Sequence, residues 1–304
     1  MASVRRLNSR AFIKKIGVLA LMMGLISPFG HVLAAEETPG TSAQTEKGEP
    51  LWELGFVAAG AYLPHYPAAA ESQTRFLPFP WLVYRGEIFR AGGDGVLSGR
   101  IIKSERVELD VSFSGSLPVS ADDNDAREGM PELDWLGGIG PRLQINLFKT
   151  GNRDRNARID FELPVRGVFS TDFSEAPEWR GVVAAPGIRY RNKNVSHSGL
   201  NLDFSAEVIF ATEEQMDYYY EVDPRFARSN RPAYDADAGY LGSKFSFNMN
   251  RKFGSRITGF LNTNLQWFSG STNSDSPLSL ETVNYEIVAG VKVALFQSDD
   301  RVRD

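Results

Sequence analysis

The chain has 304 residues, a formal net charge of −5, no cysteine and three histidines. Without cysteine it can form neither disulfides nor the common zinc sites with thiolate ligands, and three histidines disfavour a His-based metal site. The acidic balance disfavours nucleic-acid binding. We therefore predict no cofactor, no metal and no nucleic-acid partner.

The first 34 residues have the three parts of a secretory signal peptide. Basic residues precede an apolar run at 16–26, and small residues follow up to Ala34 and Ala35. The apolar run is shorter than the about 20 residues that a membrane-spanning helix needs, which disfavours the alternative of an N-terminal anchor. We predict export with cleavage after Ala34 or Ala35. The five positive charges of the leader are then lost, and the formal charge falls from −5 to −10.

Residues 35–50 are polar and contain Pro and Gly, so we expect a flexible periplasmic lead-in. After them the hydrophobic pattern has a period of two, which is typical of β-strands, and no amphipathic helical stretch of useful length follows. Several alternating segments reach 10–14 residues. Most globular strands have about 5–6 residues, whereas membrane-spanning strands need about 9–11. We expect twelve strands, at 51–60, 75–84, 87–91, 95–102, 105–116, 134–148, 157–169, 180–191, 199–211, 239–252, 256–268 and 283–296.

The segment "RIDFELPVR" at 158–166 leaves one question open. Ile159, Phe161, Leu163 and Val165 fall on one face of this strand, and charged residues fall on the other. In a soluble sandwich the apolar face would be the core. In a membrane barrel the apolar face would contact lipid and the charges would line the lumen.

The lengths of the connections favour the membrane barrel. When the strands are paired as a meander, long and short connections lie on opposite sides, apart from a short link at 92–94 on the long side. The long ones are 61–74, 117–133, 170–179, 212–238 and 269–282. Outer-membrane barrels have short periplasmic turns and longer external loops. We therefore predict an all-β fold, a transmembrane antiparallel up-and-down β-barrel of about 12 strands (10–14). It would cover residues 51–296 and be followed by a short periplasmic tail at 297–304.

Charged residues share the parity that would face the lumen. They are Arg106, Glu108, Asp110, Arg158, Asp160, Glu162, Arg166, Asp203, Glu207, Lys244, Glu286 and Lys292. One interpretation is a polar permeation path. The other is a narrow lumen filled by compensating ion pairs, which the mixed signs favour because unpaired buried charge is costly. We expect Phe161→Arg on the lipid face to cost about 2–4 kcal/mol, and Glu162→Gln in the lumen to be mild.

The strand "RFLPFPWLVY" contains Pro78 and Pro80, two residues apart. Their missing N–H groups would point to the same neighbouring strand, which removes two ladder donors. The alternatives are a locally loose seam in the barrel and a bend of the strand near its rim.

The long loop 212–238 is rich in aromatic residues and has two interpretations. It offers a candidate interaction surface, or it folds over the barrel mouth as a lid. The aromatic residues are Tyr218, Tyr219, Tyr220, Phe226 and Tyr234. The predicted topology places His65 and His197 on opposite sides of the membrane, so we expect them to form no shared catalytic site.

Three stretches resemble the MipA/OmpV family of Gram-negative outer-membrane proteins. They are "GFVAAGAYLPHYPAAAESQTRFLPFPWLVYRG", "YYYEVDPRFARSNRPAYDADAGY" and "SDSPLSLETVNYEIVAGVKVALF", in this order along the chain. The resemblance implies an outer-membrane barrel, and for some members a scaffold that links murein-hydrolysing and murein-synthesising enzymes. The C-terminus departs from the family pattern, in which an aromatic residue usually ends the last strand. Here Phe296 falls on the parity opposite to Val291, Val293 and Leu295, and "QSDDRVRD" follows it.

Taken together, these features predict a non-enzymatic structural and interaction protein located in the cell outer membrane. Its predicted partners are outer-membrane lipid and, by the resemblance, a periplasmic murein hydrolase or synthase. The alternatives are a small-solute, porin-like channel, an adhesin, an outer-membrane enzyme that modifies lipid, and a soluble periplasmic β protein. The sequence leaves the oligomeric state open.

Overall fold

The computed structural model describes residues 49–85, 90–91, 97–98, 102–104, 106–151, 156–254 and 256–302. The predicted signal peptide and residues 35–48 of the predicted lead-in lie outside this part. Within the described residues, no helix has the length and apolar character needed to cross a membrane.

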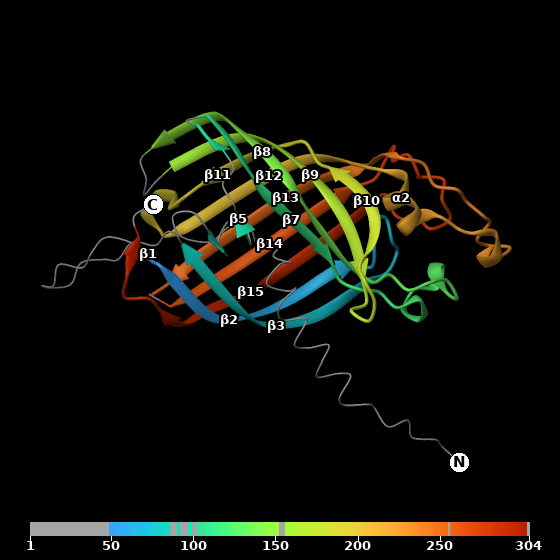
Figure 1. Cartoon of the computed structure of the whole chain (residues 1–304), viewed down its shortest axis with the longest axis horizontal. Helices are drawn as coiled ribbons and strands as arrows, with labels where there is room; N and C mark the ends of the chain where they lie inside the picture. Colours follow the sequence, from blue (N-terminus) through green and yellow to red (C-terminus); the bar gives the residue numbers. More distant parts are fainter. Residues whose placement is uncertain are drawn as a thin grey trace, which may run out of the picture.

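Long antiparallel strands make up most of the fold (Figure 1). They are β2 (Trp52–Pro64), β3 (Ser72–Arg85), β7 (Val107–Ser116), β8 (Trp135–Gly151), β9 (Asn156–Thr171), β10 (Glu178–Ala184), β11 (Gly187–Asn192), β12 (Leu200–Ala211), β13 (Gly239–Phe253), β14 (Ile257–Trp267) and β15 (Val283–Gln297). The two-residue strands are β1 (Glu49–Pro50), β4 (Arg90–Ala91), β5 (Leu97–Ser98), β6 (Ile102–Lys103) and β16 (Arg301–Val302). Helical segments are one α-helix, α2 (Glu213–Tyr220), and the 3-10 turns η1 (Ala121–Asp123), η2 (Asp125–Arg127), η3 (Val195–His197) and η4 (Pro224–Phe226).

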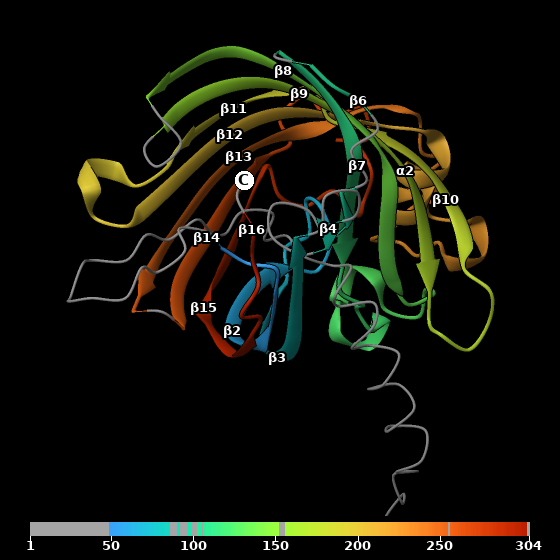
Figure 2. The ribbon, with the colours of Figure 1, turned by 60° about the vertical axis from the view of Figure 1, so that its left-hand side comes forward.

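All the described strands except β1 and β16 form one up-and-down sheet that curls into a barrel (Figure 2). Its order is β5-β4-β3-β2-β15-β14-β13-β12-β10-β9-β8-β7-β6, with β11 also between β12 and β9. The first and last long strands, β2 and β15, pair along most of their length. The two ends of the sheet, β5 and β6, are separated in sequence by only residues 99–101. The predicted antiparallel barrel is therefore confirmed.

Three of the predicted strands have a different form in the structure. The strand expected at 180–191 is broken into β10 and β11, which both pair with β9 and β12. Pro186 lies at the break and has no N–H for the ladder, so the irregularity follows from the residue itself. The segments expected at 87–91 and 95–102 are represented among the described residues only by β4, β5 and the first residue of β6.

The interior of the barrel has an apolar part and a charged part. Val57, Ala59 and Ala61 of β2 are buried together with Phe260 and Val288. Phe260 has the parity of the polar face of its own strand, and packing in this group explains why an aromatic ring stands there. The charged part lies on the wall formed by β7 to β13 and is described below.

Long and short connections lie at opposite ends of the barrel, as predicted. The long connections 65–71, 117–134, 172–177, 212–238 and 268–282 share one end with α2 (Figure 1). At the other end, β1 and β16 pair with each other, so that parts of the predicted lead-in and tail meet in a small two-stranded sheet. Outer-membrane barrels keep their short turns in the periplasm, so this second end corresponds to the side predicted from the sequence to be periplasmic.

A β-bulge near the end of β15 corrects the expected orientation of Phe296. The register of β15 on β2 shifts between Ala294 and Phe296, which leaves Leu295 as the extra residue. A bulge puts one additional residue into a strand and so reverses the parity beyond it. Leu295 and Phe296 are consequently both exposed on the outer surface, at 51% and 61%.

The two prolines of β3 lie in a ladder with β2 that continues without a register shift from Ser72 to Tyr84. Pro78 lies opposite Ala58 and Pro80 opposite Phe56. On its other edge β3 pairs, among the described residues, with β4 alone, at Tyr84 and Arg85. A loose seam therefore stays a prediction for that other edge, and the continuous ladder argues against disruption on the β2 side.

Candidate functional site

One interior wall carries a connected lattice of charges across five strands. Arg142 on β8 donates to both carboxylate oxygens of Asp110 on β7, from Nε at 2.9 Å and from Nη2 at 2.5 Å. On the other side of β9, Arg189 of β11 donates to Asp203 of β12 at 2.8 Å. Paired guanidinium and carboxylate groups satisfy the requirement that buried charges be matched.

Glu162 on β9 joins these pairs at the centre of the lattice. Its carboxylate lies 3.9 Å from a nitrogen of Arg142, 3.4 Å from one of Arg189 and 3.6 Å from one of Arg191. In register, Glu162 stands opposite Gln144 and Gly187, so its contacts with Arg142 and Arg189 are diagonal, whereas Arg191 lies four residues along β11 from Gly187. Diagonal neighbours lie within reach of long side chains.

Asp160 completes the lattice on the same strand. It is fully buried and accepts hydrogen bonds from Arg158 at 2.6 Å, from Arg191 at 2.7 Å and from Asn146 at 2.9 Å. The lattice therefore contains four arginines and four carboxylates, and its formal charge is zero.

A second group of polar contacts lies on the adjoining strands. Lys244 of β13 stands directly opposite Glu207 of β12 and forms an ion pair with it at 2.5 Å. Glu286 of β15 accepts hydrogen bonds from the amides of Asn264 and Gln266 on β14. Arg166 of β9 donates to the hydroxyl of Ser112 at 3.0 Å and makes no ion pair within the part of the chain that the structure describes. These groups bring polar contacts to three further strands.

Most of the charged residues chosen from sequence parity lie in the barrel interior. Asp110, Asp160 and Asp203 are buried, and Lys292 lies over the inward ring of Phe260, 5.8 Å from its centroid. Arg106 precedes β7 and is exposed at the short-turn rim.

The parity analysis missed Arg142, Arg189 and Arg191, which supply three of the four arginines of the lattice. The sequence did contain a signal for these inward arginines. Arginine alternates with other residues in "IRYRN", and Arg142 alternates with the apolar Leu143 and Ile145. Sequence alone could not show which carboxylate each arginine would reach.

The long loops pack on one another into a closed cap at the end opposite the short turns. Its apolar core joins four of the five loops and consists of Tyr66, Ala69, Val119, Met130, Leu133, Ala211, Met216, Tyr220, Val222, Ala236, Leu241 and Leu278. Tyr220 is 1% exposed, and its hydroxyl donates to the carbonyl of Pro67 at 3.1 Å. Ser276 in turn donates to the carbonyl of Tyr220 at 2.7 Å.

The positions of the aromatic side chains in loop 212–238 help to choose between a lid and an interaction surface. Tyr220 belongs to the core of the cap, and Tyr218, Tyr219, Phe226 and Tyr234 pack against that core and are half-buried. Burial raises the pKa of Tyr218 to about 12 and that of Tyr220 well above its ordinary value. The side chain of Tyr220 is therefore not available to a partner, and the arrangement favours the lid.

The cap also contains one of the histidines of the sequence. His65 is buried, and its Nδ1 lies 3.1 Å from the side-chain nitrogen of Asn124, which also donates to Glu71 at 2.8 Å. Burial lowers the pKa of His65, although Glu71 opposes this shift. A neutral ring can accept from Asn124 at Nδ1, so His65 serves to connect two loops.

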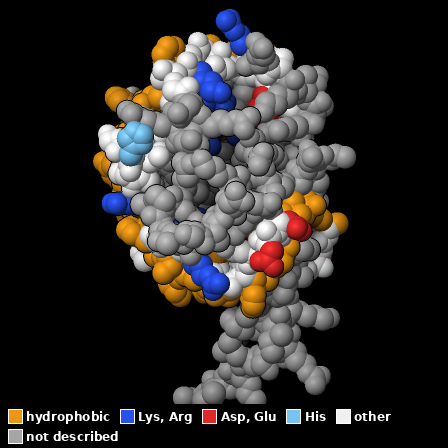
Figure 3. All heavy atoms as spheres, turned by 90° about the vertical axis from the view of Figure 1, so that its left-hand side faces the viewer, with side chains coloured by type: hydrophobic (Ala, Val, Ile, Leu, Met, Phe, Trp, Pro, Cys, Tyr) orange, Lys and Arg blue, Asp and Glu red, His pale blue; other side chains and the backbone are white. Residues whose placement is uncertain are grey.

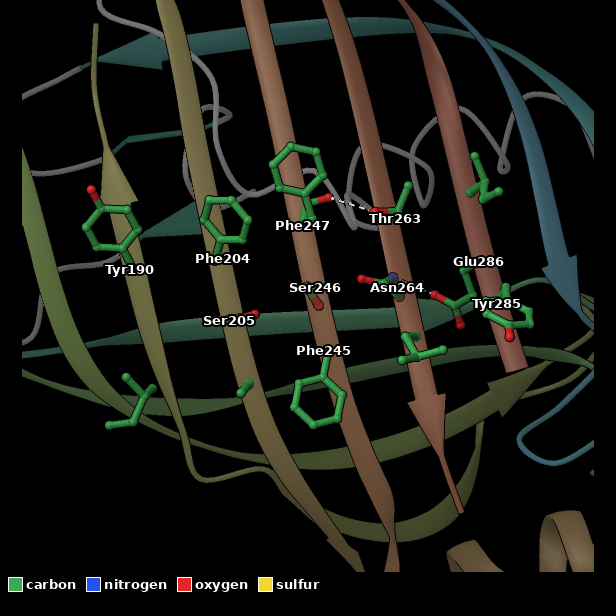
Figure 4. A pocket seen from close by; sticks show the side chains of 14 residues that line it. Tyr190, Phe204, Ser205, Phe245, Ser246, Phe247, Thr263, Asn264, Tyr285 and Glu286 are labelled. Carbon is green, nitrogen blue, oxygen red and sulfur yellow. Dashed lines mark hydrogen bonds between the residues drawn. The ribbon is translucent and has the colours of Figure 1, made fainter. Parts of the chain in front are cut away.

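The outer wall has a groove of about 700 Å³ over strands β11 to β15. In Figure 4 the rings of Phe204, Phe245 and Tyr285 line it, whereas Asn264 and Glu286 are hydrogen-bonded to each other. The three rings are 43–59% exposed and have the parity that faces lipid. The groove is therefore part of the hydrocarbon-facing surface and separate from the charge lattice.

Comparison with known protein families identifies the family to which this chain belongs. The family described as MltA-interacting protein MipA matches residues 56–294, which is most of the chain and all the long strands except the ends of the first and last. The chain belongs to the MipA family. As a member with this barrel, it is an outer-membrane protein. No curated protein matches the chain.

Solved structures that resemble the chain are distant in sequence. A NanC porin is 11% identical with a TM-score of 0.35, and the match covers 79% of this chain and 100% of that one. An outer-membrane channel from Pseudomonas putida F1 is 13% identical with a TM-score of 0.42, covering 86% and 100%. The outer membrane phospholipase A from Escherichia coli is 10% identical with a TM-score of 0.33, covering 84% and 95%. At these values the resemblance says nothing of substrate or activity.

Proposed function

We propose that this MipA-family barrel is a non-enzymatic structural and interaction protein, not an open channel. The charge lattice is the observation that supports this proposal. Asp110, Asp160, Glu162 and Asp203 are each in contact with an arginine of the same wall. Charges held by one another offer little to a passing ion, and removing one partner would leave the other buried and unpaired.

The partner that we propose is a periplasmic murein hydrolase or synthase. Support comes from the family description, which names an interaction with MltA. The short-turn end would face such a partner, and the described ends of the chain meet there. A barrel that is held rigid by its own ion pairs provides a fixed anchor for an enzyme at the membrane.

A small-solute channel is the second candidate, because one charged side chain of the wall, that of Arg166, is not part of an ion pair among the described residues. Arg166 has a hydrogen bond to Ser112 and no ion pair among the described residues. A guanidinium in this position could bind an anionic solute.

Planar-bilayer conductance of the purified, folded barrel separates the two candidates. Under our proposal the protein gives no large steady openings at neutral pH. Large steady openings that Arg166→Gln reduces for anions would support the channel and contradict the proposal.

Site-specific crosslinking tests the partner. A photo-crosslinker at Ser196, in the short turn after β11, should give adducts with a murein enzyme in intact cells. The same crosslinker at Ser174, in the long loop 172–177, is the matched control and should give none. Equal labelling from both positions, or from Ser174 alone, would contradict a periplasmic enzyme partner.

A further inference from the structure

Three adjacent turns at the short-turn end carry a cluster of cations that the ion-pair lattice does not use. We name it the basic rim: Lys149 near the end of β8, Lys193 after β11, Arg251 and Lys252 near the end of β13, and Arg256 in the turn that follows. Strands β9, β11, β12 and β13 are consecutive neighbours, so these turns lie side by side. Leu200 stands opposite Arg251, which brings the second and third turns together.

The charges of the basic rim are available to a ligand. Lys149, Arg251 and Arg256 are exposed, and none of the five makes an ion pair with a described residue. The described residues of these strand ends and turns (149–151, 193–199, 251–254 and 256) include no acidic residue. Figure 3 looks onto this end and shows Lys and Arg side chains around the rim.

The middle turn is held in a rigid and strained shape. Asn194, Ser196 and His197 have φ values of 51°, 51° and 62°, a left-handed region that residues other than glycine rarely adopt. The Asn194 side chain accepts from the N–H of Gly199 at 2.9 Å, and the Asn201 side chain accepts from the N–H of Asn194 at 3.0 Å. Strain that is retained in this way is concentrated at sites with a function. The turn projects beyond the neighbouring strand ends in Figure 2, where it joins β11 and β12.

We propose that the basic rim binds murein, the polymer beneath the outer membrane whose peptides carry free carboxylates. Because the turns occur at every second strand, neighbouring groups of cations lie about 10 Å apart along the rim. Such a spaced set of charges suits a repeating polyanion, which binds by many weak contacts. A protein interface would be expected to offer buried aromatic anchors. Here the rings beside the rim, Phe148 and Phe253, are exposed instead of buried, and Phe253 lies beneath Arg251 at 5.7 Å on the lipid-facing side.

One cation of the rim, Lys193, lies beyond the level at which lipid phosphate would bind, whereas Arg251 lies over the lipid-facing ring of Phe253. On β11 the outward ring nearest to the turn is Tyr190, and Lys193 lies past the end of that strand. A group beyond the outward rings points into the periplasm, whereas lipid phosphates lie at the level of the rings. The proposal does not depend on the enzyme partner proposed above, because it concerns the polymer itself.

Co-sedimentation with purified murein sacculi tests this proposal on the full-length barrel folded in neutral detergent. We expect binding at low salt that is lost at high salt, because exposed charges are screened. Lys193→Gln/Arg256→Gln should weaken it by about tenfold. The matched control is Arg225→Gln/Arg228→Gln, which removes two positive charges from loop 212–238 at the other end and should bind like the parent.

Two results would overturn the proposal. One is equal loss of sacculus binding in both double variants, or in neither. The other is the rim variant losing about tenfold in binding to phosphatidylglycerol vesicles but not to sacculi, which would assign the rim to lipid phosphate. Unchanged heat-modifiable migration of both variants shows that the barrel is folded in each comparison.

Discussion

At the residue scale, Glu162 is the side chain that connects the separate ion pairs of the interior wall into one network. From parity alone, Glu162→Gln was expected to be mild. In the structure its carboxylate is shared by Arg142, Arg189 and Arg191. The alternation of the sequence predicted that Glu162 faces inward, but diagonal contacts depend on register and shear, which no single strand contains. The expectation therefore changes, because three guanidiniums would lose their common partner.

We now expect Glu162→Gln to lower the free energy of unfolding by about 3 kcal/mol, since it leaves buried positive charge uncompensated. The urea midpoint of the barrel refolded into phospholipid vesicles measures this. Glu207→Gln is the matched control, because among the described residues Glu207 forms an ion pair only with Lys244. A midpoint shift for Glu162→Gln no larger than that for Glu207→Gln would contradict the role of Glu162 as the centre of the lattice.

Asp217 on α2 gives the cap a pH dependence. One of its carboxylate oxygens is buried and has no hydrogen-bond partner among the described residues. Burial, followed by the negative charges of Glu221 and Glu213, raises its pKa from 3.8 to about 6. The folded cap therefore binds more protons than the unfolded chain between these values, and its stability falls as pH rises through this window.

We expect Asp217→Asn to remove this dependence and to stabilise the cap at pH 7 by no more than about 1 kcal/mol, because the group is partly exposed and solvent screens its charge. Hydrogen exchange of the α2 amides between pH 4 and pH 7, corrected for intrinsic rates, is the measurement. Asp237→Asn, an exposed acid of the same loop, should keep the parent profile. An unchanged profile in the Asp217 variant would exclude this carboxyl as the titrating group.

At the scale of elements, the long strands were predicted well because each carries its own alternation. β9, β12, β13 and β14 begin and end within a few residues of their predicted bounds. The break at Pro186 and the bulge at Leu295 were not predicted, because a bulge is set by the partner strand. Helix α2 was also missed, since its eight residues bury Gln215, Met216 and Tyr220 against other loops instead of forming a long apolar stripe.

The bulge in β15 makes a prediction about assembly. Deleting Leu295 should remove the bulge and restore simple alternation while Phe296 stays on the outer surface opposite Leu54, so the fraction of heat-modifiable barrel in the outer membrane should stay close to that of the parent. Leu295→Ala keeps the extra residue and should assemble almost normally. Phe296→Asp keeps the bulge but puts a charge on the outer surface, and it should reduce that fraction. If Phe296→Asp assembles as well as the deletion, the outward position of Phe296 has no role in assembly.

At the scale of the whole molecule, the barrel and its cap are two packed regions with different cores. The cap core brings together loops far apart in sequence, as Tyr66 and Leu278 show through a hydrogen bond of 3.0 Å. The choice between lid and interaction surface could not be made from sequence, because both use the same aromatic composition.

Tyr220→Ala should therefore loosen the cap and leave the barrel folded. Loss of a buried aromatic side chain costs about 3–5 kcal/mol, and here the cavity lies among loops only. Limited trypsin digestion should cut the variant at Arg225 or Arg228 while the strands stay protected. Tyr218→Ala, at a half-buried ring, should be cut more slowly, and equal resistance of Tyr220→Ala and the parent would argue against the cap as a packed unit.

The pairing of β2 with β15 has a consequence for how the molecule forms. Residues 53–62 meet residues 287–297, so the seam that closes the wall joins segments more than 200 positions apart. No N-terminal fragment emerging from the export machinery can close by itself, and β2 keeps an unpaired edge until the final strand arrives. Contacts so distant along the chain make folding slow and expose open strand edges in the meantime. The neighbouring pairing of β1 with β16 can form only at the same late stage, which makes closure of this barrel a single terminal event.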